Sequence, residues 1–380
     1  MFRDMKFLHL ADLHIGKKLN DYSLLEDQRI VLGAAIDLAA KEDVDAIVIA
    51  GDVFDSSSPS AEAMTSYDWF LTALFGLKKP LLIISGNHDS AERLNVASSI
   101  LRHSGVYIVT KLEDAVKPIT IAGVDFYLMP FFRPSDVNRL LNADCKSYQA
   151  AMATLLDQMS INRAHPNVLV THQAILPTGA KVASSGSETS LDTDANGDVA
   201  GTEIIDASLF SAFDYLALGH IHKAQFVSAN ARYPGAPLKY HIKEAGAKRT
   251  FTIVEMNGKT PKVTEFDIAL PHDLAVLEGS FEELLNREGN ENDYVWCRLT
   301  DPAYVDAPFQ KLKAKYPYCL GLEFPRIRPA DVETADFDNV EEINRDDLFA
   351  AFFAKYGGRE LDEKERLFIH QLFDDEEAKA

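Results

Sequence analysis

Short apolar runs alternate with longer amphipathic segments over the first 130 residues of the chain. Lys6 to Leu10, Ala46 to Ala50 and Pro80 to Ser85 have the length and apolar content of buried strands. Leu24 to Ala40 has apolar side chains at helical spacing, and Ser58-Pro59 predicts an N-cap followed by the first residue of a second helix. This order predicts an α/β fold with a largely parallel sheet covered by helices, in which functional residues follow the carboxyl ends of strands.

The same patterns continue further along the chain. They predict strands at Val106 to Val109, Val124 to Met129, Asn167 to Val170 and Tyr215 to Leu218, and a helix over Ser147 to Met159. Residues 184 to 201 contain almost no apolar side chains, so a mobile loop is expected there. From Arg232 to Leu270 the pattern becomes rich in strands with Gly and Pro between them, which favours an antiparallel addition to the sheet.

Pro271 marks a change of pattern and a domain boundary. Residues 1–270 would form the main domain, and 271–335 a small accessory α+β unit near the lower size limit for independent folding. Residues 336–380 form a tail with two predicted amphipathic helices, Asp346 to Tyr356 and Asp362 to Phe373. Each helix places four large apolar side chains on one face, which indicates that the tail docks on a partner or packs on its own domain.

The net charge excludes some classes of protein. Lys and Arg number 38 against 58 Asp and Glu, a net charge of −20, so a protein whose whole surface is a cationic nucleic-acid coat is ruled out. The last 50 residues carry 16 acidic and 6 basic side chains, which is half of that net charge.

The cysteines and the apolar runs indicate in which cellular compartment the protein is expected. Cys145, Cys297 and Cys319 are an odd number without a C-x-x-C pair, so neither a disulfide framework nor a thiolate zinc site is indicated. No apolar run has the length of a membrane span and no signal peptide is evident, so we expect a cytoplasmic protein with no membrane contact.

Side chains able to bind metal follow five of the predicted strands. They are Asp12 and His14, Asp52 and Asp55, Asn87, His88 and Asp89, His172, and finally His220 and His222. If these strand ends lie side by side, one crevice holds all the groups. Carboxylate, imidazole and amide oxygen without thiolate favour Mn, Fe or Zn over Ca or Mg. Two such ions about 3.5–4 Å apart activate water and neutralise a phosphoryl oxygen, so the chemistry indicated is phosphoester hydrolysis.

Each of these segments alone is more typical of a turn or a helix cap than of a metal site. Their combination, D-x-H, GD-x-x-D, GNHD, a later His and G-H-x-H in that order, resembles the calcineurin-like metallophosphoesterases. The stretches FLHLADLHIGKKL, IISGNHDSAERL and DYLALGHIHKAQFVSANARYPGAPLKYHIKEAGAKRTFTIVE are similar to the SbcD family of bacterial nuclease subunits. The resemblance implies a β-sandwich flanked by helices, with a small α+β capping domain and a C-terminal helical tail.

The resemblance also implies roles for individual residues. One divalent ion, Mn most readily, would be held by Asp12, His14, Asp52 and His222, and a second by Asp52, Asn87, His172 and His220. His88 would contact the scissile phosphate and assist departure of the leaving group, and Asp89 would orient His88. Asp55 stands where some relatives have a histidine, so it either orients a neighbouring ligand or caps the turn.

The family's partner is SbcC, a coiled-coil ATPase, in a complex of two plus two subunits built on a homodimer that degrades DNA ends and opens hairpins in DNA repair. The resemblance therefore implies that the tail docks on this ATPase and that the protein works at the nucleoid. Basic residues near the strand ends either contact DNA phosphates or form a solvated face. They include Arg93, Arg133, Arg139, Lys223, Arg232, Lys239, Lys243 and Arg249.

Two other functions remain open at this point. A metallophosphodiesterase or phosphatase acting on a small molecule or a protein would use the same ligands. A non-catalytic scaffold with a degenerate site is disfavoured, because the ligand set is complete.

Overall fold

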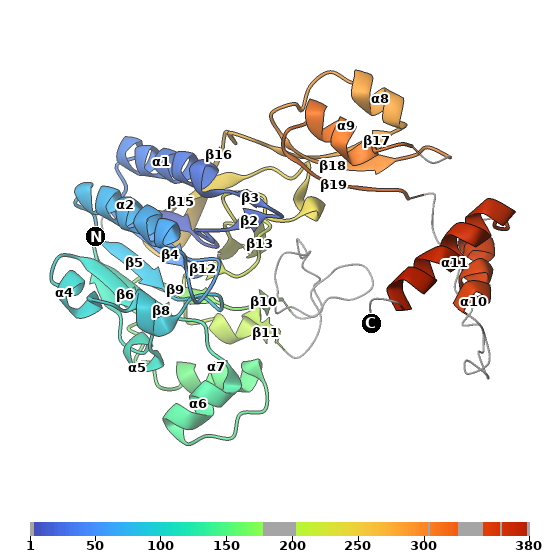
Figure 1. The fold of residues 1–380 in the computed structure, drawn as a ribbon. Coiled ribbons are helices and arrows are strands. Elements are labelled where there is room, and N and C mark those ends of the chain that lie inside the picture. The colour runs from blue at the N-terminus through green and yellow to red at the C-terminus, as the bar shows by residue number, and fades with distance from the viewer. Residues whose placement is uncertain (1–3, 178–202, 303–304, 326–344, 358, 378–380) are drawn as a thin grey trace. The chain divides into compact units, whose positions relative to one another are not determined.

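The computed structural model describes residues 4–177, 203–302, 305–325, 345–357 and 359–377 (Figure 1). The loop predicted over 184–201 and the first part of the tail lie outside these residues. The chain divides into two compact units. The first comprises Met1–Leu277, Arg287–Cys297 and Phe309–Gly321, and the second comprises Glu278–Asn286, Arg298–Pro308 and Leu322–Ala380.

A six-stranded sheet in the first unit has the order β16-β15-β1-β4-β5-β6. Its strands are Thr260–Asp267 (β16), Thr250–Asn257 (β15), Met5–Leu10 (β1), Ala46–Ala50 (β4), Leu81–Ile84 (β5) and Val106–Val109 (β6). The last four are parallel, whereas β15 is antiparallel to β1, so the predicted antiparallel addition is confirmed. Every residue of β4 is buried, as expected for a parallel strand covered on both faces.

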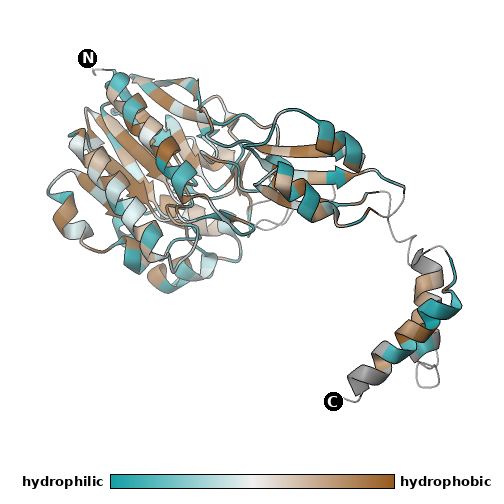
Figure 2. Cartoon of the chain, turned by 45° about the horizontal axis from the view of Figure 1, so that its top comes forward, coloured by the Kyte–Doolittle hydropathy of each residue, from teal (hydrophilic) through white to brown (hydrophobic). Residues whose placement is uncertain are grey.

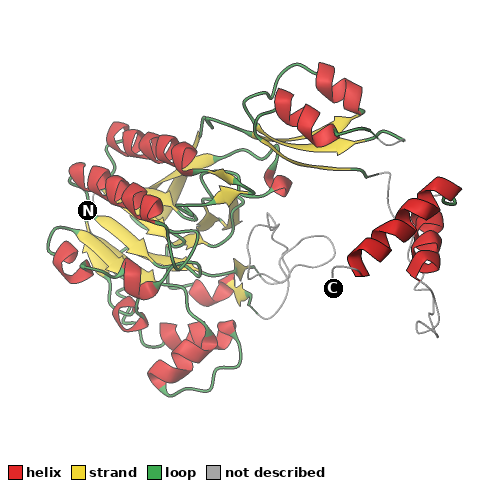
Figure 3. Ribbon diagram, viewed as in Figure 1, coloured by secondary structure: helices red, strands yellow, loops and turns green. Residues whose placement is uncertain are grey.

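A second six-stranded sheet has the order β13-β14-β12-β9-β8-β7. Figure 3 draws the strands of both sheets in yellow. Its strands are Gln225–Ser228 (β13), Ala231–Tyr233 (β14), Tyr215–Gly219 (β12), Asn167–His172 (β9), Val124–Met129 (β8) and Ile119–Ile121 (β7). The largely parallel sheet predicted from the first 130 residues is confirmed by β1, β4, β5 and β6, but the expectation that helices cover both of its faces is wrong, because the second sheet covers one of them. Apolar runs indicate that a strand is buried on both faces, but they do not indicate which sheet it joins. The β-sandwich implied by the resemblance is the observed arrangement.

Alternate side chains of the strands fill the space between the two sheets. The ring of Phe7 on β1 lies 5.5 Å from the ring of Phe126 and 5.9 Å from that of Tyr215, both on the second sheet. Leu8, the next residue on β1, faces the other way and packs with the helices that cover the first sheet. Figure 2 shows the apolar strands enclosed by helices with polar outer faces.

Helices cover both outer faces of the sandwich. The first sheet packs against Leu25–Lys41 (α1) and Ala61–Gly76 (α2), and the second against Pro134–Leu141 (α6) and Tyr148–Leu156 (α7). Shorter helices are Ala91–Leu94 (α3), Ser98–Arg102 (α4), Leu112–Ala115 (α5), Ala207–Phe210 (η1) and Ile242–Glu244 (η2). The predicted cap of α2 is two residues early, because the Ser60 hydroxyl is the group that accepts the Ala63 N–H at 3.2 Å.

Smaller elements complete the chain. They are Lys18–Leu19 (β2), Tyr22–Ser23 (β3), Ile175–Leu176 (β10) and Ile205–Asp206 (β11), and a three-stranded sheet of Leu274–Gly279 (β17), Tyr294–Leu299 (β18) and Cys319–Glu323 (β19), connected by Phe281–Asn286 (α8) and Pro308–Lys315 (α9). Within the first unit, Asp27 of α1 accepts hydrogen bonds from the Tyr294 hydroxyl at 3.1 Å and the His272 Nδ1 at 2.8 Å. These contacts anchor part of the segment after Pro271.

The second unit contains the helices Arg345–Gly357 (α10) and Glu363–Glu377 (α11). The ring of Phe349 on α10 lies 6.1 Å from the ring of Phe373 on α11, so the two helices form a hairpin. Among the hairpin side chains that the structure describes, four large apolar ones are exposed. They are Leu348 (39%), Phe352 (58%), Leu367 (61%) and Phe368 (61%). None of the helices described is long and apolar enough to cross a membrane.

Candidate metal centre

The loops that follow β1 and β4 run beside each other beyond the ends of the strands. Asp12 N–H donates to the Gly51 carbonyl at 3.1 Å, and His14 N–H donates to the Asp52 carbonyl at 3.0 Å. The loop after β5 packs against Asp52 so closely that a Cβ at Gly86 would lie 2.1 Å from its Oδ1. Only glycine allows this approach.

Four of the predicted ligands have left-handed backbone. Asp12, His14, Asp52 and His220 have φ values of 54°, 45°, 49° and 101°. Left-handed backbone at residues other than glycine is costly, and it persists where the surrounding structure holds the residue for a purpose. Here it turns each side chain into the crevice at the carboxyl ends of both sheets.

The first group of ligands is built around two facing imidazoles. His14 Nε2 and His222 Nε2 lie 3.0 Å apart, and Asp52 Oδ2 is 3.5 Å from His14 Nε2. Asp12, His14 and His222 each direct a ligand atom to one point, with these atoms within 4.8 Å of one another.

The second group is built around an amide. Asn87 Oδ1 is 3.1 Å from His172 Nε2 and 3.0 Å from His220 Nδ1. Asp52 Oδ2 is 3.3 Å from His172 Nε2, so this one oxygen adjoins both groups. His172 Nδ1 donates to the Ala50 carbonyl at 2.7 Å, so Nε2 is the nitrogen of this ring that could bind a metal ion. The structure therefore brings the seven predicted ligands together in one crevice, with Asp12 Oδ1 also 4.0 Å from His172 Nε2 of the second group.

These residues fit a pair of cations. Asp12, His14, Asp52, His172, His220 and His222 are all buried. Asp12 Oδ2 is fully buried, and none of the described groups donates a hydrogen bond to it. A buried carboxylate oxygen without a donor is unfavourable unless a metal ion or another cation occupies the site.

Electrostatics in the crevice also favour positive charge. Burial acts to lower the pKa of His172, but the charge of Asp52 and its hydrogen bond outweigh burial and raise this pKa to about 9. Burial raises the pKa of Asp12 to about 6 and lowers that of His14 to about 4. The Asp52 carboxylate thus attracts positive charge at His172, whereas burial opposes the charged forms of Asp12 and His14.

His88 has a different partner from the predicted one. Its Nδ1 lies 2.9 Å from the Asp55 carbonyl, and its backbone N–H donates to Asp52 Oδ1 at 2.9 Å. The Asp89 carboxylate, which the resemblance assigns to the His88 ring, instead accepts the N–H groups of Val53, Phe54 and Gly86 at 3.1, 2.8 and 2.9 Å. The role given to Asp89 is corrected accordingly: it ties the loops after β4 and β5 together.

Asp55 contacts one of the predicted ligands. Its Oδ1 is 3.5 Å from His14 Nδ1 and 2.9 Å from Lys17 Nζ. Of the two interpretations left open for this residue, the contacts favour orientation of His14.

Three residues beside His222 were not predicted as part of the site. Glu244 is buried with Oε1 3.7 Å from His222 Nδ1, and it pairs with the buried Arg249. The ring of Tyr240 packs against His14 and His222 at 5.3 and 5.7 Å, and its hydroxyl donates to the Leu13 carbonyl at 2.6 Å. All three belong to the KYHIKEAGAKR stretch that carried the resemblance, which was the available signal.

Part of the predicted basic cluster is not a DNA-binding surface. Arg232, Lys239 and Arg249 are buried and pair with Glu265, Asp273 and Glu244. The sequence does not distinguish a buried cation with a distant carboxylate partner from a solvated one. Arg93, Lys223 and Lys243 are exposed.

Comparisons with known proteins agree on the family. Residues 5–224 match the calcineurin-like phosphoesterase family, and residues 270–356 match a family described as the type 5 capsule protein repressor C-terminal domain. The SbcD subunit of the SbcCD nuclease of Staphylococcus epidermidis is 33% identical over 90% of each chain, and that of Staphylococcus saprophyticus is 34% identical over 84% of each chain.

Two solved structures resemble parts of the chain more distantly. A protein of Thermus thermophilus covers 69% of this chain and 99% of its own with a TM-score of 0.41 and 10% identity. A dimetal phosphatase of Danio rerio covers 70% and 99% with a TM-score of 0.36 and 12% identity.

Proposed function

Because this chain belongs to the calcineurin-like phosphoesterase family and, within it, to the SbcD group of nuclease subunits, we propose that it hydrolyses phosphodiester bonds of DNA. Its activity would be that of an exonuclease on double-stranded ends and an endonuclease on single strands and hairpins. Such a protein acts in repair, recombination and replication at the nucleoid, in the cytoplasm.

The residues that would hold the metals form two groups, defined by the contacts described above. Asp12, His14, Asp52 and His222 would hold one divalent ion, and Asp52, Asn87, His172 and His220 the other, with Asp52 Oδ2 between the groups. When bound, the two ions neutralise phosphoryl oxygens and lower the pKa of water. We propose Mn²⁺, since the set mixes imidazole with oxygen ligands and has no thiolate.

His88 would supply the proton for the leaving group. The Asp55 carbonyl accepts the Nδ1 proton of the ring, which directs Nε2 away from that loop. The step therefore uses the imidazolium form of His88, in which Nε2 also carries a proton. Water attacks phosphorus and loses a proton to solvent, the bond to the leaving oxygen breaks, and the imidazolium passes its Nε2 proton to that oxygen. Asp89 supports this step through the loop backbone.

DNA contacts are proposed for the exposed cations Arg93, Lys223 and Lys243. A net charge of −20 opposes tight binding of DNA by one chain alone. We therefore propose that two copies of this chain form a homodimer and assemble with two copies of an SbcC-type coiled-coil ATPase. Light scattering of the chain alone and of the mixture tests this stoichiometry.

The functional division proposed for the chain follows from these roles. Residues 1–270 would carry the nuclease centre, 271–335 an accessory unit that caps the DNA site, and 336–380 the ATPase docking segment. The exposed apolar side chains of α10 and α11 support the last assignment.

The proposal rests on the buried Asp12 Oδ2, which accepts no hydrogen bond from the described residues. It lies in a centre where one Asp52 oxygen adjoins both imidazole groups. The test incubates the purified chain with Mn²⁺ and a single-stranded oligonucleotide, a blunt duplex, a hairpin, or a chromogenic phosphodiester. Cleavage of the DNA that stops on chelation and returns with Mn²⁺ is expected. Hydrolysis of the chromogenic ester without DNA cleavage would instead favour a small-molecule phosphodiesterase, and undiminished nuclease activity after exhaustive chelation would exclude the two-metal mechanism.

A further inference from the structure

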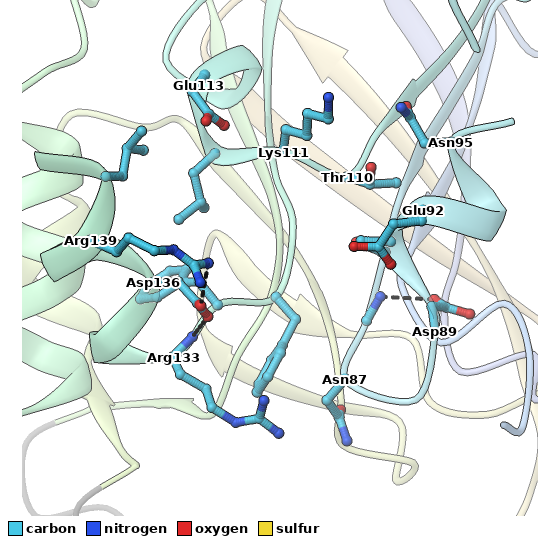
Figure 4. Close-up of a pocket in the computed structure, with 17 residues that line it drawn as sticks. Asn87, Asp89, Glu92, Asn95, Thr110, Lys111, Glu113, Arg133, Asp136 and Arg139 are labelled. Atoms are coloured by element: carbon cyan, nitrogen blue, oxygen red, sulfur yellow. Dashed lines mark hydrogen bonds and ion pairs between the residues drawn. The ribbon is translucent and has the colours of Figure 1, made fainter. Parts of the chain in front are cut away.

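A cavity of about 850 Å³ adjoins the metal centre at Asn87 (Figure 4). Its walls come from the loops after β5, β6 and β8 and from α6, all within the first unit. Its volume lies in the range typical of sites for small organic ligands or single building blocks of a polymer. No residue of this cavity beyond Asn87 and Asp89 has a part in the proposed chemistry.

Phe131 forms the wall nearest the metal ligands. Its ring lies 6.2 Å from that of His220 and 6.4 Å from that of His172. Its backbone N–H donates to the Ser85 carbonyl at 2.9 Å, which fixes the loop after β8 to the end of β5. The half-buried Phe131 ring is therefore fixed in position and presents an aromatic face directly beside the predicted ligands of the second group.

Cations stand next to this aromatic surface. The Arg133 guanidinium lies 5.8 Å from the centre of the Phe131 ring, and no carboxylate of the described residues forms an ion pair with it. Figure 4 shows its side chain extending towards the side of the cavity where Asn87 lies. Arg139, in contrast, is bound by Asp136 at 3.1 Å.

The far wall is polar rather than basic. Thr110, Lys111, Glu92 and Glu113 line it, and the Thr110 hydroxyl is buried with no hydrogen-bond partner among the described residues. A cavity with mixed charge does not attract a run of phosphates. It does suit one phosphate at Arg133 and the hydrogen-bonding edge of one base or sugar deeper inside.

We infer that this cavity holds one unpaired nucleotide of the DNA strand. This nucleotide would be next to the phosphodiester that is cut, and it would lie on the side of the metal centre formed by Asn87, His172 and His220. The base stacks on Phe131 and its phosphate contacts Arg133. This inference rests on the proposed nuclease function and adds a requirement to it. A base inside a duplex has no free face, so the nucleotide must leave its pair before cleavage.

An abasic residue in the substrate tests this directly. The cut in a single-stranded oligonucleotide is mapped, and an abasic residue then replaces the nucleotide on either side of it. We expect one of the two replacements to lower kcat/KM of the wild-type enzyme about tenfold to a hundredfold, the size of one base–aromatic stack. Phe131→Ala should lower kcat/KM for the intact oligonucleotide by a similar factor and lose sensitivity to that replacement, whereas Phe131→Tyr should keep both.

Controls separate stacking from damage to the site. Phe75→Ala, at an exposed aromatic on α2, should behave as wild type. Bound metal is measured in each variant, and Phe131→Leu replaces Phe131→Ala if the latter does not fold. Arg133→Gln should raise KM for the oligonucleotide. It should also reduce the slope of log affinity for DNA against log salt concentration by about one, the value for one phosphate contact.

The outcomes are distinct. If wild-type enzyme cuts DNA and Phe131→Ala keeps full activity or full sensitivity to the abasic residue, the nucleotide subsite is wrong. If wild-type enzyme cuts no DNA, the proposed nuclease function itself fails.

Discussion

Buried polar groups make up the metal centre, whereas exposed apolar groups make up the hairpin of α10 and α11. In the centre, Asp12, Asp52 and His172 are almost without solvent contact, and backbone hydrogen bonds hold their loops. In the hairpin, Phe352 and Phe368 expose more than half of their surface. Buried carboxylates without a cation and exposed apolar rings in water are both unfavourable. Bound cations would stabilise the metal centre, and a protein surface covering the rings would stabilise the hairpin. Substitutions in the two regions should therefore have separable effects.

Substitution at Asp52 should have the largest effect on catalysis. Asp52→Asn removes the charge that adjoins both imidazole groups, so we expect loss of bound metal and a fall in phosphodiester hydrolysis of roughly a thousandfold or more. Metal analysis and the rate on a chromogenic phosphodiester measure it. Asp125→Asn is the matched control, since this buried carboxylate binds His165 and Thr120 instead. Normal metal content in Asp52→Asn would refute the bridging role.

Substitution at His88 should slow chemistry while leaving the metals in place. His88→Leu removes the proposed proton donor, and loss of a general acid costs about a hundredfold or more. The backbone N–H of residue 88 still reaches Asp52, so the ligand set keeps its geometry. Metal content equal to wild type together with a slower kcat is the expected result. An empty site in the purified variant would show that His88 is a ligand or a structural residue.

The two regions also differ in what the sequence could predict. The convergence of side chains such as those of His14 and His222 was predictable, because a polar residue that closely follows a buried strand lies at the edge of a sheet whatever the sheet's neighbours are. The distribution of those strands over two sheets was not predictable from the apolar runs. Neither was the partner of His88, because a backbone carbonyl such as that of Asp55 leaves no mark in the side-chain pattern.

Buried ion pairs were the other omission. Arg249 was grouped with basic residues expected to contact DNA phosphates or to form a solvated face, yet it is buried and pairs with the buried Glu244 beside His222. Their burial depends on tertiary packing, which charge patterning along the chain does not contain. The tail helices were predicted at nearly their observed bounds, because local spacing of Phe and Leu suffices for a helix whose apolar face is still exposed.

Glu244→Gln should have an intermediate effect. The amide keeps an oxygen for the Tyr240 N–H but loses the charge near His222 Nδ1, so metal affinity should fall about tenfold to a hundredfold. Titration of the metal-free protein with Mn²⁺ measures it, and added metal should restore most of the activity. Glu265→Gln is the control, as Glu265 pairs with Arg232 away from the ligands. Equal metal affinity in wild type and Glu244→Gln would mean that Glu244 serves only to neutralise Arg249.

Substitutions on the hairpin should have the smallest effect on catalysis. Phe352→Ser and Phe368→Ser remove exposed apolar area, so hydrolysis of a chromogenic phosphodiester should stay within about twofold of wild type, as surface changes away from a site usually do. Binding to an SbcC-type ATPase should weaken strongly, because burying each such ring contributes about 1.5–3 kcal/mol. Pull-down and calorimetry with the ATPase measure this, and Ile100→Ser, at a side chain 71% exposed on α4, is the control. If the Phe352 and Phe368 variants bound the ATPase as wild type does, or lost basal hydrolysis while folded, the hairpin would have another role and the separation of the two regions would fail.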